Sequence, residues 1–297
     1  MPELPEVHAL VADLGSRLIG HQVKRLDIVS FAALKTFDPP ASALDGRTVS
    51  AVSQHGKFLD LEFDSPTDAP VHLVLNLARA GWIRWRSVAP APAKRPGAGP
   101  IAARLIMLGD DELAAGSGLD ITEAGTKKSL ALWIVRSAWE VPRVATLGPD
   151  PLGPNFTSEA LGRILATKGR AQIKGVLRDQ STIAGIGNAY SDEILHAAKM
   201  SPFKPAAMTE DEVAVLFDAM QSTLRSAIAR ADGLAASELK AEKKLNLRVH
   251  GRNGLPCPVC GDTVRQVIFA DSTFQYCPTC QTGGKPLADR VLSRLLK

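Results

Sequence analysis

Two short stretches, Cys257-Pro258-Val259-Cys260 and Cys277-Pro278-Thr279-Cys280, decide the fold of the C-terminal part of this chain. Two Cys-x-x-Cys knuckles separated by 16 residues are typical of a tetrahedral structural zinc site on a β-hairpin. They use all four cysteines of the sequence, so we expect one closed site that holds a single Zn²⁺ and shapes the chain. A redox pair or disulfides are the alternative interpretation, which a cytosolic location disfavours.

Upstream of the knuckles, the region from residue 157 to about 235 has helical periodicity. One helix begins near residue 161. A longer amphipathic helix follows Thr209, where Glu212 three residues later completes a capping-box pattern. Between them, the turn at Gly185-Ile-Gly-Asn188 predicts a helix–turn–helix in which Asn188 caps the second helix. The backbone N–H groups at such a helix start suit a phosphate, although a plain helix–helix corner fits the same residues.

Further upstream, the chain changes to short β-type runs broken by Gly, Pro, Asp and Ser. Their close spacing, with no helices between them, predicts antiparallel strands in a sandwich or barrel. The runs are 22–29, 47–54, 57–63, 71–77, 80–86, 101–108 and 130–136. A Pro-rich loop at 88–100 lies inside this β region, and the Leu147–Pro154 segment is the better candidate for a domain boundary.

The first six residues, Met1-Pro2-Glu3-Leu4-Pro5-Glu6, place two carboxylates and two prolines at a chain end. Because the residue after Met1 is small, we expect removal of Met1, which leaves a secondary α-amine at Pro2. Such an amine titrates near pH ~8 and is partly neutral and nucleophilic at physiological pH. Glu3 and Glu6 stand beside it as acid or base groups. A plain interpretation is that Pro5 begins a helix over 6–19 and that Glu6 stabilises the positive end of its dipole.

Length and composition permit two or more domains with ordinary cores. The chain has 297 residues, of which 45% are hydrophobic and 22% charged. No apolar run approaches the ~20 residues of a membrane span, and no secretory signal precedes the first helix, so a cytosolic protein is expected. The formal net charge is +4, and the excess lies in residues 151–297, with 19 Lys and Arg against 14 Asp and Glu. This bias permits a phosphate-backbone partner.

Taken together, these motifs resemble the formamidopyrimidine-DNA glycosylase/endonuclease VIII family of base-excision repair enzymes, and they follow the family's order. The residues that carry the resemblance are Pro2-Glu-Leu-Pro-Glu-Val7, His55-Gly-Lys-Phe-Leu59, Leu147-Gly-Pro-Asp-Pro-Leu152, the Asp179–Glu193 segment, Val249-His-Gly-Arg252 and the two knuckles. The family fold implies an α+β chain: an antiparallel β-sandwich with an N-terminal helix, a helix–two-turn–helix domain and a zinc-finger β-hairpin with four cysteine ligands. We therefore expect domains at 1–141, 157–245 and 246–284, a linker at 142–156 and a tail at 285–297.

The resemblance also implies roles for single residues. Pro2 corresponds to the nucleophile that attacks C1′ of the damaged nucleotide, Glu3 to the acid that opens the sugar ring, and Glu6 to a supporting carboxylate. Lys57 corresponds to the lysine that binds phosphate near the lesion and assists elimination. The expected DNA contacts are Arg79, Lys127, Lys128, Arg170, Lys174, Asn188, Arg252 and Ser272. Lys240, Lys243, Lys244 and Arg248 either extend this basic track or form a solvated face.

Two departures from the family pattern bear on substrate and product. Strand-nicking members usually carry an arginine five residues before the third cysteine, where this chain has Ser272, which cannot clamp a phosphate as a bidentate cation. This calls δ-elimination, the grip on phosphate, or both into question. In the family, certain side chains fill the gap that an everted base leaves in the duplex, and these also differ here. Arg79 lies near the position where the family often has a methionine, and the Gly125-Thr126 loop holds no aromatic residue.

The sequence therefore predicts a monomeric DNA glycosylase with apurinic/apyrimidinic lyase activity in a bacterial cytosol or nucleoid. It would act on damaged double-stranded DNA that carries an oxidised base, without a nucleotide cofactor or a membrane. A non-catalytic lesion- or structure-specific DNA-binding protein on the same scaffold is the alternative, and an RNA-binding zinc-ribbon protein is a third. The intact Pro2, Glu3, Glu6 and Lys57 favour the enzyme, because a pure binder has no need of the N-terminal amine.

Overall fold

The computed structural model describes residues 2–88, 99–269 and 272–287 and divides into two compact units. Unit 1 comprises Met1–Thr146 with Ala231–Leu239, and unit 2 comprises Leu147–Arg230 with Lys240–Lys297. The first break falls inside the linker expected at 142–156. The helical segment and the zinc hairpin, expected as separate domains, belong to the same compact unit apart from 231–239.

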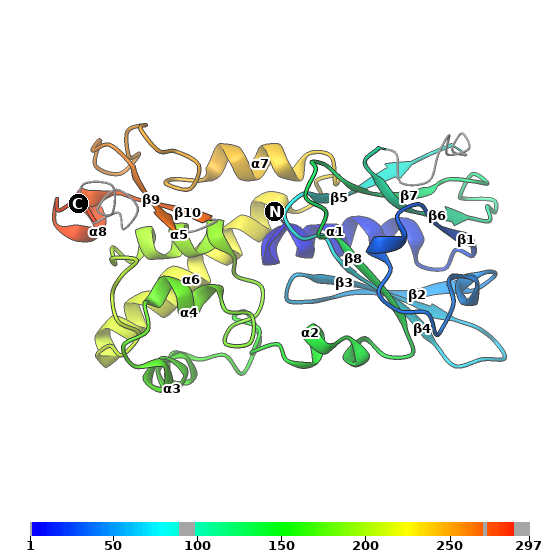
Figure 1. Cartoon of the computed structure of the whole chain (residues 1–297), viewed down its shortest axis with the longest axis horizontal. Helices are drawn as coiled ribbons and strands as arrows, with labels where there is room; N and C mark the ends of the chain where they lie inside the picture. The colour runs from blue at the N-terminus through cyan, green and yellow to red at the C-terminus, as the bar shows by residue number, and fades with distance from the viewer. Residues whose placement is uncertain (1, 89–98, 270–271, 288–297) are drawn as a thin grey trace. The chain divides into compact units, whose positions relative to one another are not determined.

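Unit 1 contains two four-stranded antiparallel sheets (Figure 1). One sheet has the order β2-β3-β4-β8 and consists of β2 (Thr48–His55), β3 (Phe58–Asp64), β4 (Val71–Asn76) and β8 (Ala131–Val135). The other has the order β1-β6-β7-β5 and consists of β1 (Val23–Ile28), β6 (Ile101–Met107), β7 (Gly118–Glu123) and β5 (Gly81–Arg86). The expected β-sandwich is confirmed, since residues of both sheets share one apolar core.

All seven predicted strands are present, and the eighth, β7, was missed by sequence reasoning. Its apolar residues Leu119 and Ile121 are buried in the core, and the polar Thr122 and Glu123 are buried as well. The segment carries Asp120 and Glu123, which lower its strand propensity. β7 lies between β5 and β6, so pairing on both sides stabilises a stretch that its own propensity does not favour.

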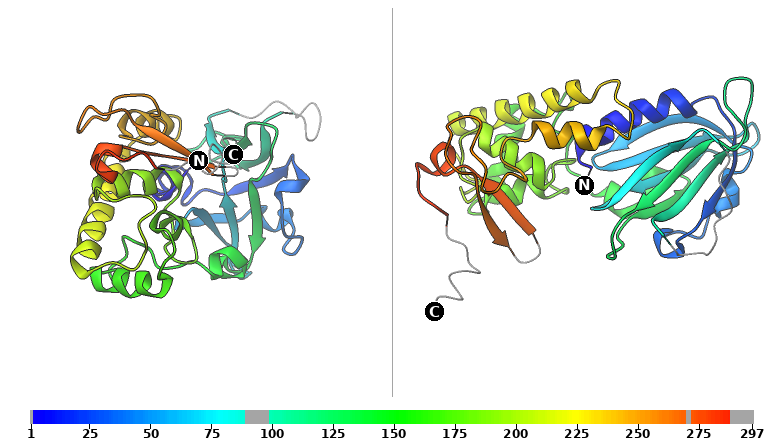
Figure 2. Two further views of the ribbon diagram at one scale, coloured as in Figure 1. Left: turned by 60° about the vertical axis from the view of Figure 1, so that its left-hand side comes forward. Right: turned by 90° about the horizontal axis from the view of Figure 1, so that it is seen from above.

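The N-terminal helix α1 (Leu4–Leu18) packs against β2 and β3 of the first sheet (Figure 2). Its apolar positions Val7, Leu10, Leu14 and Leu18 are at most 1% exposed, which confirms the predicted apolar face. The helix begins two residues earlier than expected. Because a fully buried face holds α1, the residues immediately before it are anchored to the sheet that carries β2 and β3.

The core of unit 1 is completed by residues far along the chain. Ala231, Ala236 and Leu239 belong to the same apolar cluster as the sheets. The indole of Trp82, on β5, donates a 3.0 Å hydrogen bond to the backbone carbonyl of Ala236. These contacts explain why 231–239 groups with unit 1 and not with the expected 157–245 domain.

The remaining elements are mostly helical. Unit 1 also has short 3₁₀ turns, η1 (Phe31–Ala33), η2 (Ala41–Leu44) and η3 (Ala138–Glu140), and the short helix α2 (Pro142–Ala145). Unit 2 contains α3 (Ser158–Lys168), α4 (Ile173–Arg178), α5 (Asn188–Ala197), α6 (Glu210–Ala231, whose last residue groups with unit 1), α7 (Leu239–Asn246, whose first residue groups with unit 1), the hairpin β9 (Arg265–Phe269) with β10 (Ser272–Tyr276), and α8 (Pro278–Thr282).

The capping box predicted at the start of α6 is confirmed. The backbone N–H of Thr209 donates to Glu212 Oε2 at 3.2 Å, and the N–H of Glu212 donates to Thr209 Oγ1 at 3.3 Å. Within the described residues, no helix combines the length and the apolar character needed to cross a membrane.

Candidate functional site

The predicted reactive end of the chain lies at the start of α1. Pro2, Glu3 and Glu6 are buried. Glu3 is the N-cap residue, and its carboxylate accepts a hydrogen bond from the N–H of Glu6. In return Glu6 Oε2 accepts one from the N–H of Glu3 at 2.9 Å. The plain interpretation of this stretch is confirmed: the motif is a helix start with Pro5 in its first turn, and the same capping box fixes the backbone next to Pro2. The role of Pro2 as a nucleophile stays a prediction.

Lys57 lies in the two-residue turn that joins β2 to β3. The strand residues on either side, His55 and Phe58, pair directly in register, and Gly56 provides the positive φ of +56° that this tight turn requires. Lys57 is half-buried and directly precedes β3, as expected for a side chain positioned by a rigid hairpin. Its role as a phosphate contact stays a prediction.

A His–Asp–His cluster next to this turn was missed by sequence reasoning. Asp60, on β3, is 5% exposed; its Oδ2 lies 3.1 Å from His55 Nε2, and its Oδ1 lies 3.0 Å from His72 Nδ1. Burial by itself raises the pKa of Asp60, but the hydrogen bonds with both histidines outweigh it and lower that pKa. The hydrogen bond to Asp60 in turn raises the pKa of His72. The period of two puts these side chains on one face of adjacent strands, but the register that brings them together is not visible in the sequence.

The other expected contacts in unit 1 lie on two loops. Arg79 is exposed in the turn between β4 and β5, where Ala78 has an unusual positive φ of +47°. Lys127 and Lys128 are exposed in the loop after β7, and Lys128 Nζ donates to the backbone carbonyl of Glu123 at 2.5 Å. The buried carboxylate of Glu123 also accepts backbone N–H groups of the same loop. The loop that carries both lysines is therefore tied to the end of β7.

In unit 2, Lys174 lies in an environment that differs from the expected phosphate contact. It is 5% exposed, and its ammonium group donates to Asp192 Oδ1 at 2.5 Å, Ser191 Oγ at 2.8 Å and the carbonyl of Asn188 at 3.3 Å. Three acceptors match the three donors of an ammonium group. The structure thus favours a buried ion pair that joins α4 to α5, and the direct phosphate role of Lys174 remains an untested prediction.

The prediction that Asn188 caps the second helix is wrong. The N-cap of α5 is Gly187, and Asn188 is already the first helical residue. Its side-chain Nδ2 instead donates a 2.6 Å hydrogen bond to the carbonyl of Thr273 on β10. Asn188 therefore links the start of α5 to the zinc hairpin, and its predicted phosphate contact is not tested by this geometry.

The last three expected DNA contacts, Arg170, Arg252 and Ser272, also belong to unit 2. Arg170 is exposed at the turn before α4. Arg252 is half-buried, and its Nη2 donates to the carbonyl of Pro256 at 3.4 Å, just before the first knuckle. Ser272 is the first residue of β10 and pairs in register with Phe269. Their roles stay predictions.

The two knuckles bring all four cysteines together. Cys260 Sγ lies 3.3 Å from Cys277 Sγ, and Cys257 Sγ lies 3.9 Å from Cys280 Sγ. These separations far exceed the ~2.05 Å of an S–S bond, so the thiols are not paired as disulfides. They are close to the spacing of sulfur ligands around one tetrahedral ion.

Burial shapes the chemistry of these thiols. It raises the pKa of Cys277 to about 11 and also raises the pKa of Cys280, whereas a hydrogen bond from the backbone of Asp262 lowers the pKa of Cys260. Buried thiols that resist ionisation are readily deprotonated by a metal ion. The donor set fits one structural Zn²⁺, as the sequence predicted.

A further imidazole at this cluster was not foreseen. His196, near the end of α5, places Nε2 3.4 Å from Cys257 Sγ. One donor atom each from His196, Cys257, Cys277 and Cys280 lie within 4.8 Å of one another. Burial, and then the charge of Arg248, lower the pKa of His196 to about 4, so the ring is neutral. Sequence spacing offered no signal, because His196 lies 61 residues before Cys257.

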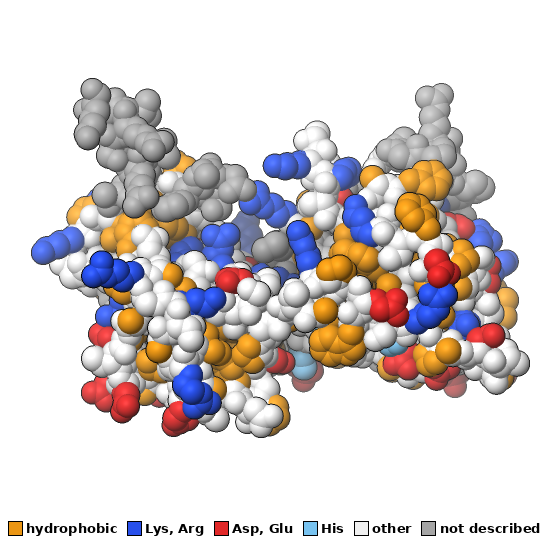
Figure 3. Space-filling model, turned by 60° about the horizontal axis from the view of Figure 1, so that its bottom comes forward, with side chains coloured by type: hydrophobic (Ala, Val, Ile, Leu, Met, Phe, Trp, Pro, Cys, Tyr) orange, Lys and Arg blue, Asp and Glu red, His pale blue; other side chains and the backbone are white. Residues whose placement is uncertain are grey.

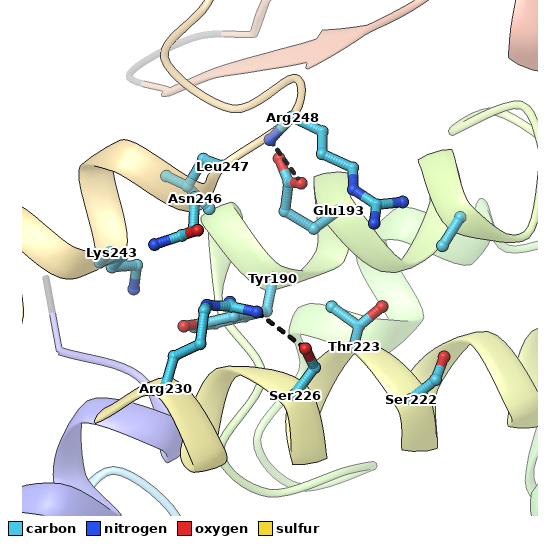
Figure 4. Close-up of a pocket in the computed structure, with 11 residues that line it drawn as sticks. Tyr190, Glu193, Ser222, Thr223, Ser226, Arg230, Lys243, Asn246, Leu247 and Arg248 are labelled. Atoms are coloured by element: carbon cyan, nitrogen blue, oxygen red, sulfur yellow. Dashed lines mark hydrogen bonds between the residues drawn. The ribbon is translucent and has the colours of Figure 1, made fainter. Parts of the chain in front are cut away.

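Basic side chains of unit 2 also line a pocket of about 330 Å³ beside α5, α6 and α7 (Figure 4). Lys243 Nζ lies 4.5 Å from the ring centroid of Tyr190, and Arg230 donates to Ser226 Oγ at 2.8 Å. The acid in the pocket lining, Glu193, accepts backbone N–H groups from Arg248 and the two residues after it. Figure 3 shows one face of the molecule, on which Lys and Arg side chains are scattered over both units among apolar and acidic ones.

Comparison with known proteins agrees with this architecture. Three family models match: the formamidopyrimidine-DNA glycosylase N-terminal domain over residues 1–114, the formamidopyrimidine-DNA glycosylase H2TH domain over 147–238, and the zinc finger found in FPG and IleRS over 254–283. The zinc-finger match and the cysteine cluster together support one structural zinc ion.

Two curated relatives illustrate the range of similarity. An "uncharacterized formamidopyrimidine-DNA glycosylase-like protein" of Mycobacterium tuberculosis is 57% identical over 157 residues, which cover 52% of this chain and 98% of that protein. The formamidopyrimidine-DNA glycosylase of Moorella thermoacetica is 33% identical over 275 residues, which cover 90% of this chain and 94% of that protein.

A solved structure shares the fold over nearly the whole chain. The crystal structure of the MutM (Fpg) protein from Thermus thermophilus has a TM-score of 0.76 and 29% sequence identity, and the match covers 96% of this chain and 100% of that one. With full-length relatives above 30% identity and three matching domains in order, this chain belongs to the formamidopyrimidine-DNA glycosylase family.

Proposed function

We propose that this protein is a DNA glycosylase of base-excision repair with apurinic/apyrimidinic lyase activity, acting as a monomer on duplex DNA that carries an oxidised base. The observation that carries the proposal is the start of α1, where Glu3 and Glu6 cap the helix reciprocally and so fix the backbone that directly follows Pro2. A nucleophile on a frayed chain end would have no fixed geometry, whereas this one is attached to a helix with a fully buried face.

The proposed chemistry runs through the amine of Pro2 after removal of Met1. The nitrogen of Pro2 attacks C1′, the bond from C1′ to the base breaks, and the base leaves with a proton. Glu3 protonates the ring oxygen of the sugar, which opens to an iminium ion on Pro2. Loss of a C2′ proton then expels the 3′ phosphate in β-elimination, and water hydrolyses the iminium ion and restores the amine.

Supporting roles follow from the positions of the other candidates. Lys57 would bind a phosphate near the lesion and assist elimination from its rigid turn, and Glu6 would keep the backbone of Glu3 in place. The exposed Arg79, Lys127, Lys128 and Arg170 suit contacts with the DNA backbone, whose affinity depends on salt. Structural neighbours from Lactococcus lactis were solved with DNA that contains an abasic site, which supports a DNA partner for this fold.

Borohydride trapping tests the proposal most directly. The protein is incubated with duplex DNA containing one abasic site, and borohydride reduces any imine to a stable covalent adduct. We expect an adduct with the wild type and none with Pro2→Gly. Pro5→Ala is the matched control, because it removes the other proline of the motif and should retain the adduct. Intact mass of the same sample verifies that Met1 has been removed.

Two further outcomes separate the alternatives. Tight binding to abasic DNA without any adduct, in protein that begins at Pro2, would refute the lyase and leave a lesion-binding protein on the glycosylase scaffold. A panel of duplexes with oxidised purines, oxidised pyrimidines and alkylated bases then identifies the base that is excised. The product end reports on Ser272: we expect β-elimination, and a 3′ phosphate would show that δ-elimination proceeds without an arginine there.

A further inference from the structure

The zinc cluster contains one side chain that the two knuckles do not account for. His196 belongs to α5 and is 3% exposed. Its Nε2 lies 3.4 Å from Cys257 Sγ, within the usual range for an N–H···S hydrogen bond and also near the distance between two ligands of one ion. With the four cysteines, the site offers five donor groups to an ion that binds four.

The two possible roles of His196 require opposite tautomers. If Nε2 bound zinc, the ring proton would reside on Nδ1, and a metal-bound histidine almost always donates that proton to a partner. Nδ1 of His196 is buried, and within the described residues it has no hydrogen-bond partner. A buried N–H without an acceptor is costly. In the other tautomer Nε2–H points at Cys257 Sγ, and the donor is satisfied.

Cys260 has the position expected of the fourth ligand. Its sulfur lies 3.3 Å from Cys277 Sγ, and the backbone of Asp262 hydrogen-bonds to it, as the backbone beyond a zinc knuckle does. Four thiolates around Zn²⁺ carry a net charge of −2, which is unfavourable at a site where Cys257 and Cys277 are buried. A donor aimed at one of these sulfurs reduces that cost.

We propose that Cys257, Cys260, Cys277 and Cys280 bind the zinc ion and that His196 donates a hydrogen bond from Nε2 to the thiolate of Cys257. His196 is thus a positioning residue that couples α5 to the first knuckle. The hydrogen bond withdraws electron density from the sulfur, so zinc is released more slowly. Loss of a partner beyond the ligands typically lowers metal affinity about 10- to 100-fold.

Zinc release from the full-length protein tests the proposal. A coloured chelator follows release from the wild type, His196→Phe and His196→Gln, with the exposed His8→Gln as the matched control. We expect release about tenfold faster in His196→Phe, partial recovery in His196→Gln because its amide can donate, and no change in His8→Gln. Equal rates in the wild type and His196→Phe would overturn the hydrogen bond.

Cobalt substitution distinguishes the donor from a ligand. In the Co²⁺ protein, the sulfur-to-metal charge-transfer intensity reports the number of bound thiolates. We expect Cys260→Ser to lower that intensity, and His196→Phe to move the band to lower energy without lowering its intensity. Intensity unaffected by Cys260→Ser would make His196 the fourth ligand and refute the proposal.

One measurement needs no variant and therefore remains decisive if a variant fails to fold. Long-range ¹H–¹⁵N correlation spectra of the wild-type zinc protein report the tautomer of each histidine. We expect the proton of His196 on Nε2. A proton on Nδ1 would overturn the proposal.

Discussion

Two residues that the sequence suggested as DNA contacts make hydrogen bonds within unit 2 in the structure. Lys174 is the clearest case, since its ammonium group lies among Asp192, Ser191 and the carbonyl of Asn188. Asn188 is similar, because its amide binds the hairpin strand β10. Neither placement was predictable from one sequence. The residues around a helical lysine do not show whether it faces solvent or a buried carboxylate 18 positions away.

Substitutions at Lys174 and at Arg170 distinguish a residue that stabilises the fold from one that contacts DNA. Lys174→Met should destabilise the protein by about 3 kcal/mol in urea unfolding, because it removes the ammonium group from the ion pair of the fully buried Asp192 and leaves His250 as its neighbour. Arg170→Ala should change stability by less than about 0.5 kcal/mol, since Arg170 is exposed. In a salt titration of DNA binding, Arg170→Ala should reduce the slope by about one. If Lys174→Met were as stable as the wild type and reduced the salt slope of DNA binding, Lys174 would instead be a phosphate contact.

Helices and strands were predicted better than the contacts between them. The apolar face of α1, the capping box of α6 and seven strands followed from periodicity and local residue preferences. The strand β7 did not, because its two neighbours stabilise it and its own composition does not. Long-range pairing is invisible to a local pattern, and the same reason explains why the cluster of His55, Asp60 and His72 was missed.

The His–Asp–His cluster of His55, Asp60 and His72 predicts a pH dependence of stability. The folded pKa of His72 is raised above its usual 6.5, so its contribution is complete below pH ~6.5 and is lost as pH rises through the raised pKa. The folded pKa of Asp60 is lowered, so its contribution is complete above pH ~4 and is lost as pH falls through the lowered value. We therefore expect the free energy of unfolding to fall as pH rises from about 6.5 through the raised pKa of His72.

Denaturant titrations at several pH values measure this effect. His72→Gln should flatten the decline above pH ~6.5, because the group that releases a proton there is removed. His8→Gln, an exposed change on α1, serves as the control. The idea fails if His72→Gln and the wild type lose stability with the same slope.

The whole molecule offers separate optical probes for its two units. All four tryptophans, Trp82, Trp85, Trp133 and Trp139, belong to unit 1, whereas both tyrosines, Tyr190 and Tyr276, belong to unit 2. Tryptophan fluorescence therefore reports on the β-sandwich. Helical circular dichroism comes largely from unit 2, which holds most of the long helices in the described residues.

Removing zinc should affect these probes unequally. The cluster closes the hairpin region of unit 2, so a chelator should lower the midpoint of helical unfolding by roughly 10 °C, equivalent to about 3–5 kcal/mol for a domain of this size. The tryptophan midpoint should move much less. The same chelator preloaded with zinc is the control. An equal shift of the helical and the tryptophan midpoints would contradict the prediction that zinc stabilises unit 2 more than unit 1.

The segment 231–239 gives unit 1 an unusual order of assembly. Its core needs Ala231, Ala236 and Leu239, and Trp82 needs the carbonyl of Ala236. A ribosome makes these residues only after the whole of 147–230 has been synthesised. The nascent β-sandwich therefore lacks Ala231, Ala236 and Leu239 of its core until α3 to α6 of the other unit have been made, and that unit is itself completed only afterwards by residues 240–297. A fragment that stops at residue 146 would keep the proposed catalytic end and lack the segment that closes its core.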